Sequence, residues 1–80
     1  MAFDPKMIEE LNLILKFPSK SLMQGLKIHK DADSSIIEAA QRLYDKGIVQ
    51  QPDGGYLTDL GHDLAEHVQL LKSALTYKKH

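Results

Sequence analysis

The sequence predicts a mainly α-helical domain with one small β-hairpin. Apolar residues recur at helical spacing in three segments, and turn-forming residues separate two short β-prone runs near position 50. No apolar run approaches the length of a membrane span. With 80 residues, 42% of them hydrophobic and 26% charged, the composition is that of one globular domain, so we expect residues 1–80 to share one core.

The first helix is predicted over about residues 5–16. Asp4 is a suitable N-cap, and Pro5 follows at the first helical position, where its missing N–H costs no hydrogen bond. Pro18 ends the helix because proline cannot continue it. The inner face is expected to consist of Met7 or Ile8, Leu11, and Ile14 or Leu15.

Residues 19–30 allow two interpretations. A serine near the start could cap a helix of about two turns, with Leu22 and Leu26 facing inward. Gly25 weakens such a helix by about 1 kcal/mol relative to alanine. Alternatively, residues 26–29 form a short strand that pairs with the hairpin. The helix is the favoured interpretation.

The next helix is predicted to start at Asp33 or Ser34 and to end before Gly47. Either of the first two residues can cap the helix, and the glycine suits the left-handed position that stops it. The inner face is expected to be Ile36, Ala40 and Leu43, with Ile37, Ala39 and Tyr44 at its margins.

Residues 48–57 predict a hairpin. The segment Pro52–Gly55 reads Pro-Asp-Gly-Gly, in which proline fixes φ and glycine accepts a positive φ. This segment should form the tip of the hairpin. We expect at least one buried residue in each flanking pair, Ile48 or Val49 and Tyr56 or Leu57.

The last helix is predicted over about residues 58–76, with Thr58 as its cap. Its apolar stripe consists of Leu60, Leu64, Val68, Leu71 and Leu75. One small core is too short to cover the whole stripe, and uncovered apolar stripes mark contacts. We therefore expect a homodimer that pairs these helices through Val68, Leu71 and Leu75. The alternative is a monomer in which the first helix covers the stripe.

The segment "LYDKGIVQQPDGGYLTDLG", residues 43–61, resembles the local pattern of winged helix-turn-helix transcription regulators. Its matching positions are Leu43, Gly47, Ile48, Val49, Gly54, Gly55 and the run from Leu57 and Thr58 to Gly61. The resemblance implies the order helix, helix, helix, hairpin, helix. More narrowly, the whole chain is similar to a small family of uncharacterised gammaproteobacterial proteins that carry a DNA-binding label.

The resemblance implies a DNA-binding, transcription-associated protein, and this is the favoured function. The third helix would enter the major groove of double-stranded DNA, and lysines before it would contact phosphates. The residues assigned to DNA are Lys20, Lys27, Lys30, Ser34, Ser35, Gln41 and Arg42. Glu38 departs from the arginine, threonine or asparagine expected on such a helix, because phosphates repel a carboxylate.

The charge balance favours an alternative function. The net charge is −1, and residues 31–66 hold eight acidic residues against two basic ones, a balance of −6. A dedicated nucleic-acid binder usually has a basic excess. The alternative is a protein–protein interaction module of the same fold without direct DNA binding. For either function we expect a cytoplasmic protein that does not contact a membrane.

The sequence indicates neither catalysis nor a metal or cofactor site. It contains no cysteine, no nucleophile elbow and no glycine-rich phosphate loop. The segment "GHDLAEH", residues 61–67, matches neither of the zinc motifs HExxH and HxxEH. Its polar side chains are expected to face solvent. We therefore expect a protein that is not an enzyme and binds no cofactor.

Overall fold

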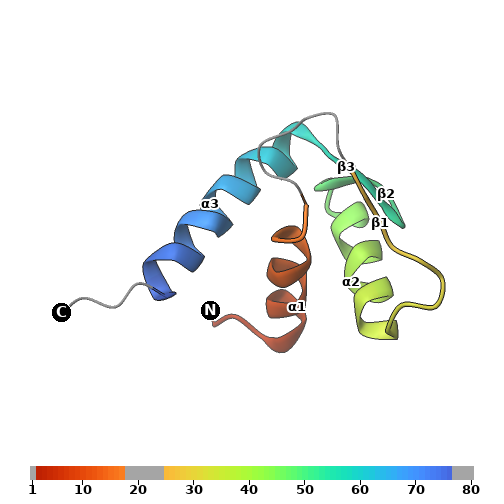
Figure 1. Cartoon of the computed structure of the whole chain (residues 1–80), viewed down its shortest axis with the longest axis horizontal. Helices are drawn as coiled ribbons and strands as arrows, with labels where there is room; N and C mark the ends of the chain where they lie inside the picture. The colour runs from red at the N-terminus through yellow and green to blue at the C-terminus, as the bar shows by residue number, and fades with distance from the viewer. Residues whose placement is uncertain (1, 18–24, 77–80) are drawn as a thin grey trace.

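The computed structural model describes residues 2–17 and 25–76. Within these residues the elements are α1 (Pro5–Ile14), β1 (Leu26–Lys27), α2 (Ser34–Asp45), β2 (Val49–Gln51), β3 (Gly54–Leu57) and α3 (Asp59–Thr76). The strands form one antiparallel sheet in the order β1-β3-β2. The predicted class, mainly α with a small β-hairpin, is confirmed, and the arrangement is consistent with a winged helix. Figure 1 shows α1 and α2 side by side, with α3 leading away from the sheet.

The start of α1 is the predicted one, and its buried face agrees with the prediction in part. Asp4 caps the helix, because its carboxylate accepts a hydrogen bond from the Met7 N–H at 2.9 Å. The buried residues of the helix are Glu10, Leu13 and Ile14. Ile8, expected as a candidate for the inner face, is 48% exposed. Ile14 is buried as predicted and Leu11 packs against the core, whereas the buried Glu10 and Leu13 were not expected on this face.

The hairpin predicted for residues 48–57 is present. β2 and β3 pair antiparallel, with Val49 opposite Leu57. Both of these side chains are buried, and so is that of Ile48, whereas Tyr56 is exposed. Each of the two expected pairs therefore supplies at least one residue to the core.

The tip of the hairpin is tighter than predicted. Only Pro52 and Asp53 lie between the strands, while Gly54 and Gly55 belong to β3. Both glycines have positive φ, at 110° and 73°. The pairing register also shifts between Val49 and Gln51, so the ladder is irregular within β2. These glycines therefore shape the strand itself as well as the turn.

β1 lies on the outer edge of β3. Leu26 pairs with Gly55, and the Ile28 N–H donates a hydrogen bond to the Asp53 carbonyl at 2.8 Å. The favoured prediction of a helix through Leu26 is therefore wrong at β1, and the alternative strand is confirmed there. The pairing partner lies far along the chain, so helical spacing in a short run could not reveal it. Residues 18–24, which would hold the rest of that helix, lie outside the described residues.

α2 keeps the predicted limits. Asp33 occupies the N-cap position, although its side chain makes no capping hydrogen bond. Gly47 follows the helix with a φ of 77°, the left-handed conformation that was predicted for it. The buried residues of α2 are Ala39, Ala40 and Leu43. Ile36, expected on the inner face, is half-buried.

α3 begins after Thr58, as predicted. The Thr58 hydroxyl accepts a hydrogen bond from the Gly61 N–H at 3.0 Å and donates one to the Gly47 carbonyl at 2.6 Å. The buried residues of the helix are Gly61, Ala65 and Val68. Leu60, the first residue of the predicted apolar stripe, is 56% exposed, and Leu75, which was expected to lie beyond the core, is 78% exposed.

A steric contact determines which face of α3 is buried. A Cβ atom added to Gly61 would collide with the Ile48 carbonyl, so the first turn of the helix lies directly against the backbone that leads from α2 into β2. Only a small residue allows this close approach. Gly61 and Ala65 therefore face the core, and Leu60 is turned outward.

One core joins α1, α2, the sheet and the first half of α3. Its members are Leu13, Ile14, Phe17, Ala39, Ala40, Leu43, Ile48, Val49, Leu57, Ala65 and Val68. All residues from Leu70 to Thr76 are exposed. The second half of α3 therefore extends beyond the core, as Figure 1 shows.

Candidate interaction surfaces

The outer face of α2, with the β1–α2 loop and the hairpin tip beside it, is where the resemblance places DNA. The exposed side chains of this face include two carboxylates, Glu38 and Asp45. The Gln41 amide donates a hydrogen bond to the Asp45 carboxylate at 3.1 Å. Within α2 the only cation is Arg42, and it bonds to α1. The face that would approach phosphates is therefore acidic.

Arg42, one of the residues assigned to DNA, is occupied inside the protein. Its Nε donates to the Glu10 carboxylate at 2.9 Å, and its Nη2 lies 3.4 Å from a carboxylate oxygen of Glu9. The same Nη2 lies 3.3 Å from the Lys6 carbonyl oxygen. Lys46 also donates a hydrogen bond to Glu10. This cluster fixes α2 against α1 and does not point toward a ligand.

The Glu10 carboxylate is stabilised in its charged form. Burial raises the pKa of Glu10, but hydrogen bonds from Lys46 and Arg42 outweigh burial, so the net pKa lies below its ordinary value. The hydrogen bond to Glu10 raises the pKa of Arg42 against the opposing effect of desolvation. Among the described residues, no buried side-chain nitrogen or oxygen lacks a partner. The cluster is therefore a satisfied structural contact.

Sequence reasoning missed Glu10, although a signal for it exists. Arg42 and Lys46 are four residues apart, so they share one face of the helix predicted to end before Gly47. Two cations on a face that packs against another helix need a buried acidic partner. The two carboxylates of α1, Glu9 and Glu10, were the candidates to supply it.

The lysines assigned to phosphate contacts differ in whether they form an ion pair. The Lys27 ammonium lies 3.5 Å from the carboxylate of Asp53 at the hairpin tip, and both side chains are well exposed. Lys30 is exposed and makes no ion pair with any other residue that the structure describes. Lys20 lies outside the described residues.

A hollow of about 220 Å³ lies where the β1–α2 loop, α2 and the hairpin tip meet. Its apolar wall consists of Ile28, Ile37 and Pro52, and its polar wall of His29, Lys30, Gln41 and Asp53. The structure therefore brings together two of the residues assigned to DNA, Lys30 and Gln41. Ser34 is exposed at the start of α2 and does not line this hollow.

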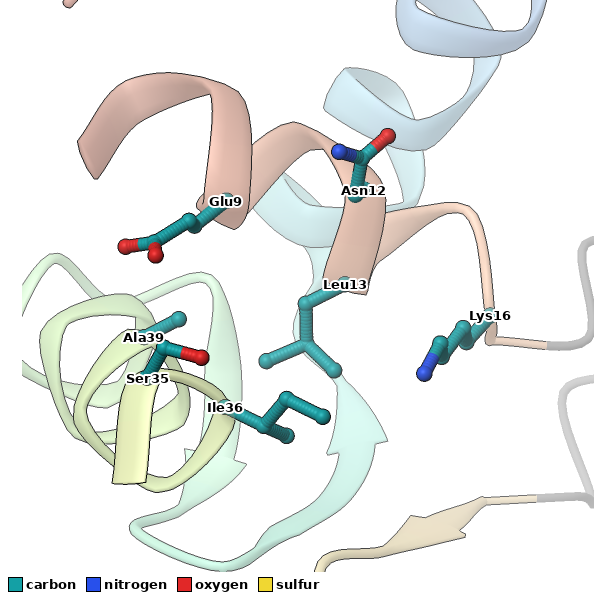
Figure 2. A pocket seen from close by; sticks show the side chains of 7 residues that line it. All are labelled: Glu9, Asn12, Leu13, Lys16, Ser35, Ile36 and Ala39. Atoms are coloured by element: carbon teal, nitrogen blue, oxygen red, sulfur yellow. The ribbon is translucent and has the colours of Figure 1, made fainter. Parts of the chain in front are cut away.

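A second hollow of about 180 Å³ lies between α1 and α2 (Figure 2). Leu13, Ile36 and Ala39 form its apolar part. Figure 2 shows Glu9 and Lys16 on opposite sides of it, with Ser35 nearby. Ser35 therefore borders the hollow next to α1, apart from the hollow that holds Lys30 and Gln41.

The third surface is an apolar groove between α1 and α3, defined here as the α1–α3 groove. It has a volume of about 250 Å³. Its lining residues are Phe3, Met7, Glu10, Leu11, Ile14, Leu43, Lys46, Ile48 and Leu64. Phe3, which the sequence did not single out, is an exposed large apolar residue at its edge. The groove is therefore an apolar surface that the protein's own helices leave open.

Beyond the groove, the second half of α3 presents three leucines to solvent. Leu70 is 69% exposed, Leu71 is 40% exposed and Leu75 is 78% exposed. Val68, the third residue predicted for a dimer contact, belongs to the core instead. Of the predicted dimer residues, only Leu71 and Leu75 therefore lie on the surface.

The polar residues of "GHDLAEH" lie along the first half of α3. Asp63, Glu66 and His67 are exposed, and His62 is half-buried. Within the ranges that the structure describes, no group of three or more His, Cys, Asp or Glu side chains is placed to hold a metal ion. In the same ranges, no helix combines the length and the apolar character needed to cross a membrane.

Comparison with known proteins assigns the chain to one family. A family model described as a family of unknown function, DUF5669, matches residues 1–76. The chain belongs to this family. No curated protein and no solved structure matches it. The family description assigns no activity.

Proposed function

We propose that this chain is a protein–protein interaction module with a winged-helix-like shape. The observation that carries the proposal is the apolar surface formed by the α1–α3 groove and the exposed leucines 70, 71 and 75 of α3. Burying a leucine side chain contributes about 1.5–3 kcal/mol, so several exposed leucines on one helix are a strong source of binding energy. Exposed apolar surface of this extent on a small protein marks a contact site.

The charges on α2 support the same proposal. Non-specific DNA binding depends on exposed cations that replace the counterions of the phosphates. Here Arg42 is held by Glu10, and Lys27 is paired with Asp53. The outer face of α2 carries Glu38 and Asp45. If α2 entered the major groove of DNA, this face would bring carboxylates toward phosphates.

The proposal is tested by retention of partners from an extract of the native cells. A tagged protein is used with and without nuclease treatment, alongside the variant Leu75→Glu and the control Ile37→Glu. Each substitution replaces an exposed apolar side chain with a carboxylate, one on α3 and the other on α2. We expect the partner protein to stay bound to the wild type after nuclease treatment. It should be lost with Leu75→Glu and should stay bound to Ile37→Glu. Retention that disappears with nuclease would contradict the proposal.

DNA binding is the second candidate, and one observation favours it. Lys30 and Gln41 line the same hollow together with His29, next to the hairpin tip. Binding to random duplex DNA should then weaken as salt increases, and Lys27→Ala with Lys30→Ala should flatten the slope by about one unit per lost phosphate contact. Lys6→Ala on α1 is the matched control. No measurable affinity at low salt would eliminate this candidate.

A further inference from the structure

We infer that the partner of the α1–α3 groove is a second copy of this chain, so that the second half of α3 of each protomer lies in the groove of the other. The inference rests on the proposed function and names the partner of that surface. It is independent of any contact with DNA.

Each chain carries both halves of the contact. One half is the end of α3 that extends past the core, with Leu71 and Leu75 exposed. The other half is the apolar groove, to which Met7, Leu11 and Leu64 contribute. A two-fold axis places both helix ends in both grooves at the same time, which is the self-complementary arrangement of most homodimers. The same operation removes both uncovered apolar surfaces from water.

The charges along α3 select a second copy and its direction. The first half of the helix contains Asp59, Asp63 and Glu66. After Glu66 the sequence contains no acidic residue, and Lys72 lies on the exposed second half. An antiparallel pair of α3 helices brings the acidic half of one protomer to Lys72 of the other, and the helix dipoles oppose favourably. A parallel pair would instead bring like charges together.

The first test is the oligomeric state of the full chain in solution. Sedimentation of the wild type at tens of micromolar should show a dimer. Leu71→Glu and Leu75→Glu should each weaken dimerisation by about tenfold or more, because they place a charge in an apolar contact. Both positions lie outside the core, so circular dichroism should show the helices retained. Ile37→Glu on α2 is the matched control and should remain a dimer.

The second test uses the absence of cysteine from the sequence. Single-cysteine chains Leu60→Cys and Leu75→Cys place a thiol at the first and last turns of α3, where both native side chains are exposed. In an antiparallel pair, a mixture of the two chains should form a mixed disulfide on mild oxidation. Leu75→Cys alone should not form one, because the two C-terminal ends lie far apart.

Two outcomes would overturn the inference. The first is a wild-type protein that stays monomeric at these concentrations, and the second is a dimer that neither glutamate substitution weakens. The proposed function can be contradicted independently of the homodimer. If the wild type is monomeric but a different protein is still retained from the extract and is lost with Leu75→Glu, the homodimer is wrong and the interaction module stands.

Discussion

The Nε atom of Arg42 lies 2.9 Å from the Oε2 atom of Glu10, and this hydrogen bond joins α2 to α1 across 32 positions of the chain. Lys46 bonds to the other oxygen of the same carboxylate. One buried carboxylate therefore holds Arg42 of α2 and Lys46 at the C-cap of that helix, and fixes how α2 lies on α1. It also removes from the surface the cation that α2 would otherwise offer to a phosphate.

Replacing Glu10 by glutamine should destabilise the protein by about 1–3 kcal/mol, because a neutral amide cannot satisfy two cations in a partly buried site. The free energy of unfolding from urea denaturation measures this loss. Glu9→Gln is the matched control, since Glu9 lies 3.4 Å from Arg42 and is more exposed than Glu10. Its effect should stay within about 1 kcal/mol. Equal losses for the two variants would show that the cluster is not centred on Glu10.

The contribution of Glu10 should depend on pH in one direction. The folded pKa of Glu10 lies below its ordinary value, so the folded state binds fewer protons there than the unfolded state does. The stabilisation is therefore fully present above the ordinary pKa of about 4.3 and is lost as the pH falls through the lower folded value. The difference in unfolding free energy between wild type and Glu10→Gln should shrink below about pH 4. A constant difference from neutral to acidic pH would contradict this assignment.

Gly54→Ala should cost more stability than Gly47→Ala. Both glycines have positive φ, so both alanines incur a backbone strain of about 1–2 kcal/mol. At Gly47 a Cβ meets nothing within 4 Å, whereas at Gly54 it collides with the Leu26 carbonyl on β1. Urea denaturation should rank the two variants. Faster hydrogen exchange at the Ile28 amide should show that β1 has been separated from β3, and similar costs for both variants would exclude that collision.

Thr58→Val should weaken the start of α3 by about 1 kcal/mol, because it removes the N-cap oxygen. The lost contacts are the bond from the Gly61 N–H and the bond to the Gly47 carbonyl. Thr58→Ser keeps the hydroxyl and should retain most of the stability. Thermal unfolding of the two variants makes the comparison. A serine variant as unstable as the valine variant would indicate that the methyl group, and not the cap, is what matters.

The parts of the fold that depend on local chemistry could be predicted from the sequence. Asp4 and Thr58 cap the helices that they precede, and the Pro-Asp-Gly-Gly segment turns the chain between β2 and β3. Each of these features is decided by residues within a few positions of one another. Patterns of residue type are sufficient at that range.

The parts that depend on distant neighbours could not be predicted in the same way. The buried face of α3 is set by the approach of Gly61 to the Ile48 carbonyl, and hydropathy alone favours the leucines. The strand β1 exists because β3 offers a glycine edge far along the chain. The role of Arg42 is set by Glu10 on another helix. The exposure of Leu71 and Leu75 was predicted, because the sequence shows that the last helix is longer than one small core can cover.

The buried residues of α3 all lie in its first ten positions, so the helix is held at one end only. Without tertiary contacts, its last two turns depend on intrinsic propensity, and short lengths of helix are marginal in water on that basis. Binding to a partner would then stabilise the last two turns of α3. Backbone amides near Thr76 would exchange with solvent quickly in the free protomer and slowly in the complex. The far end of α3 thus serves as a built-in reporter of whether the groove is occupied.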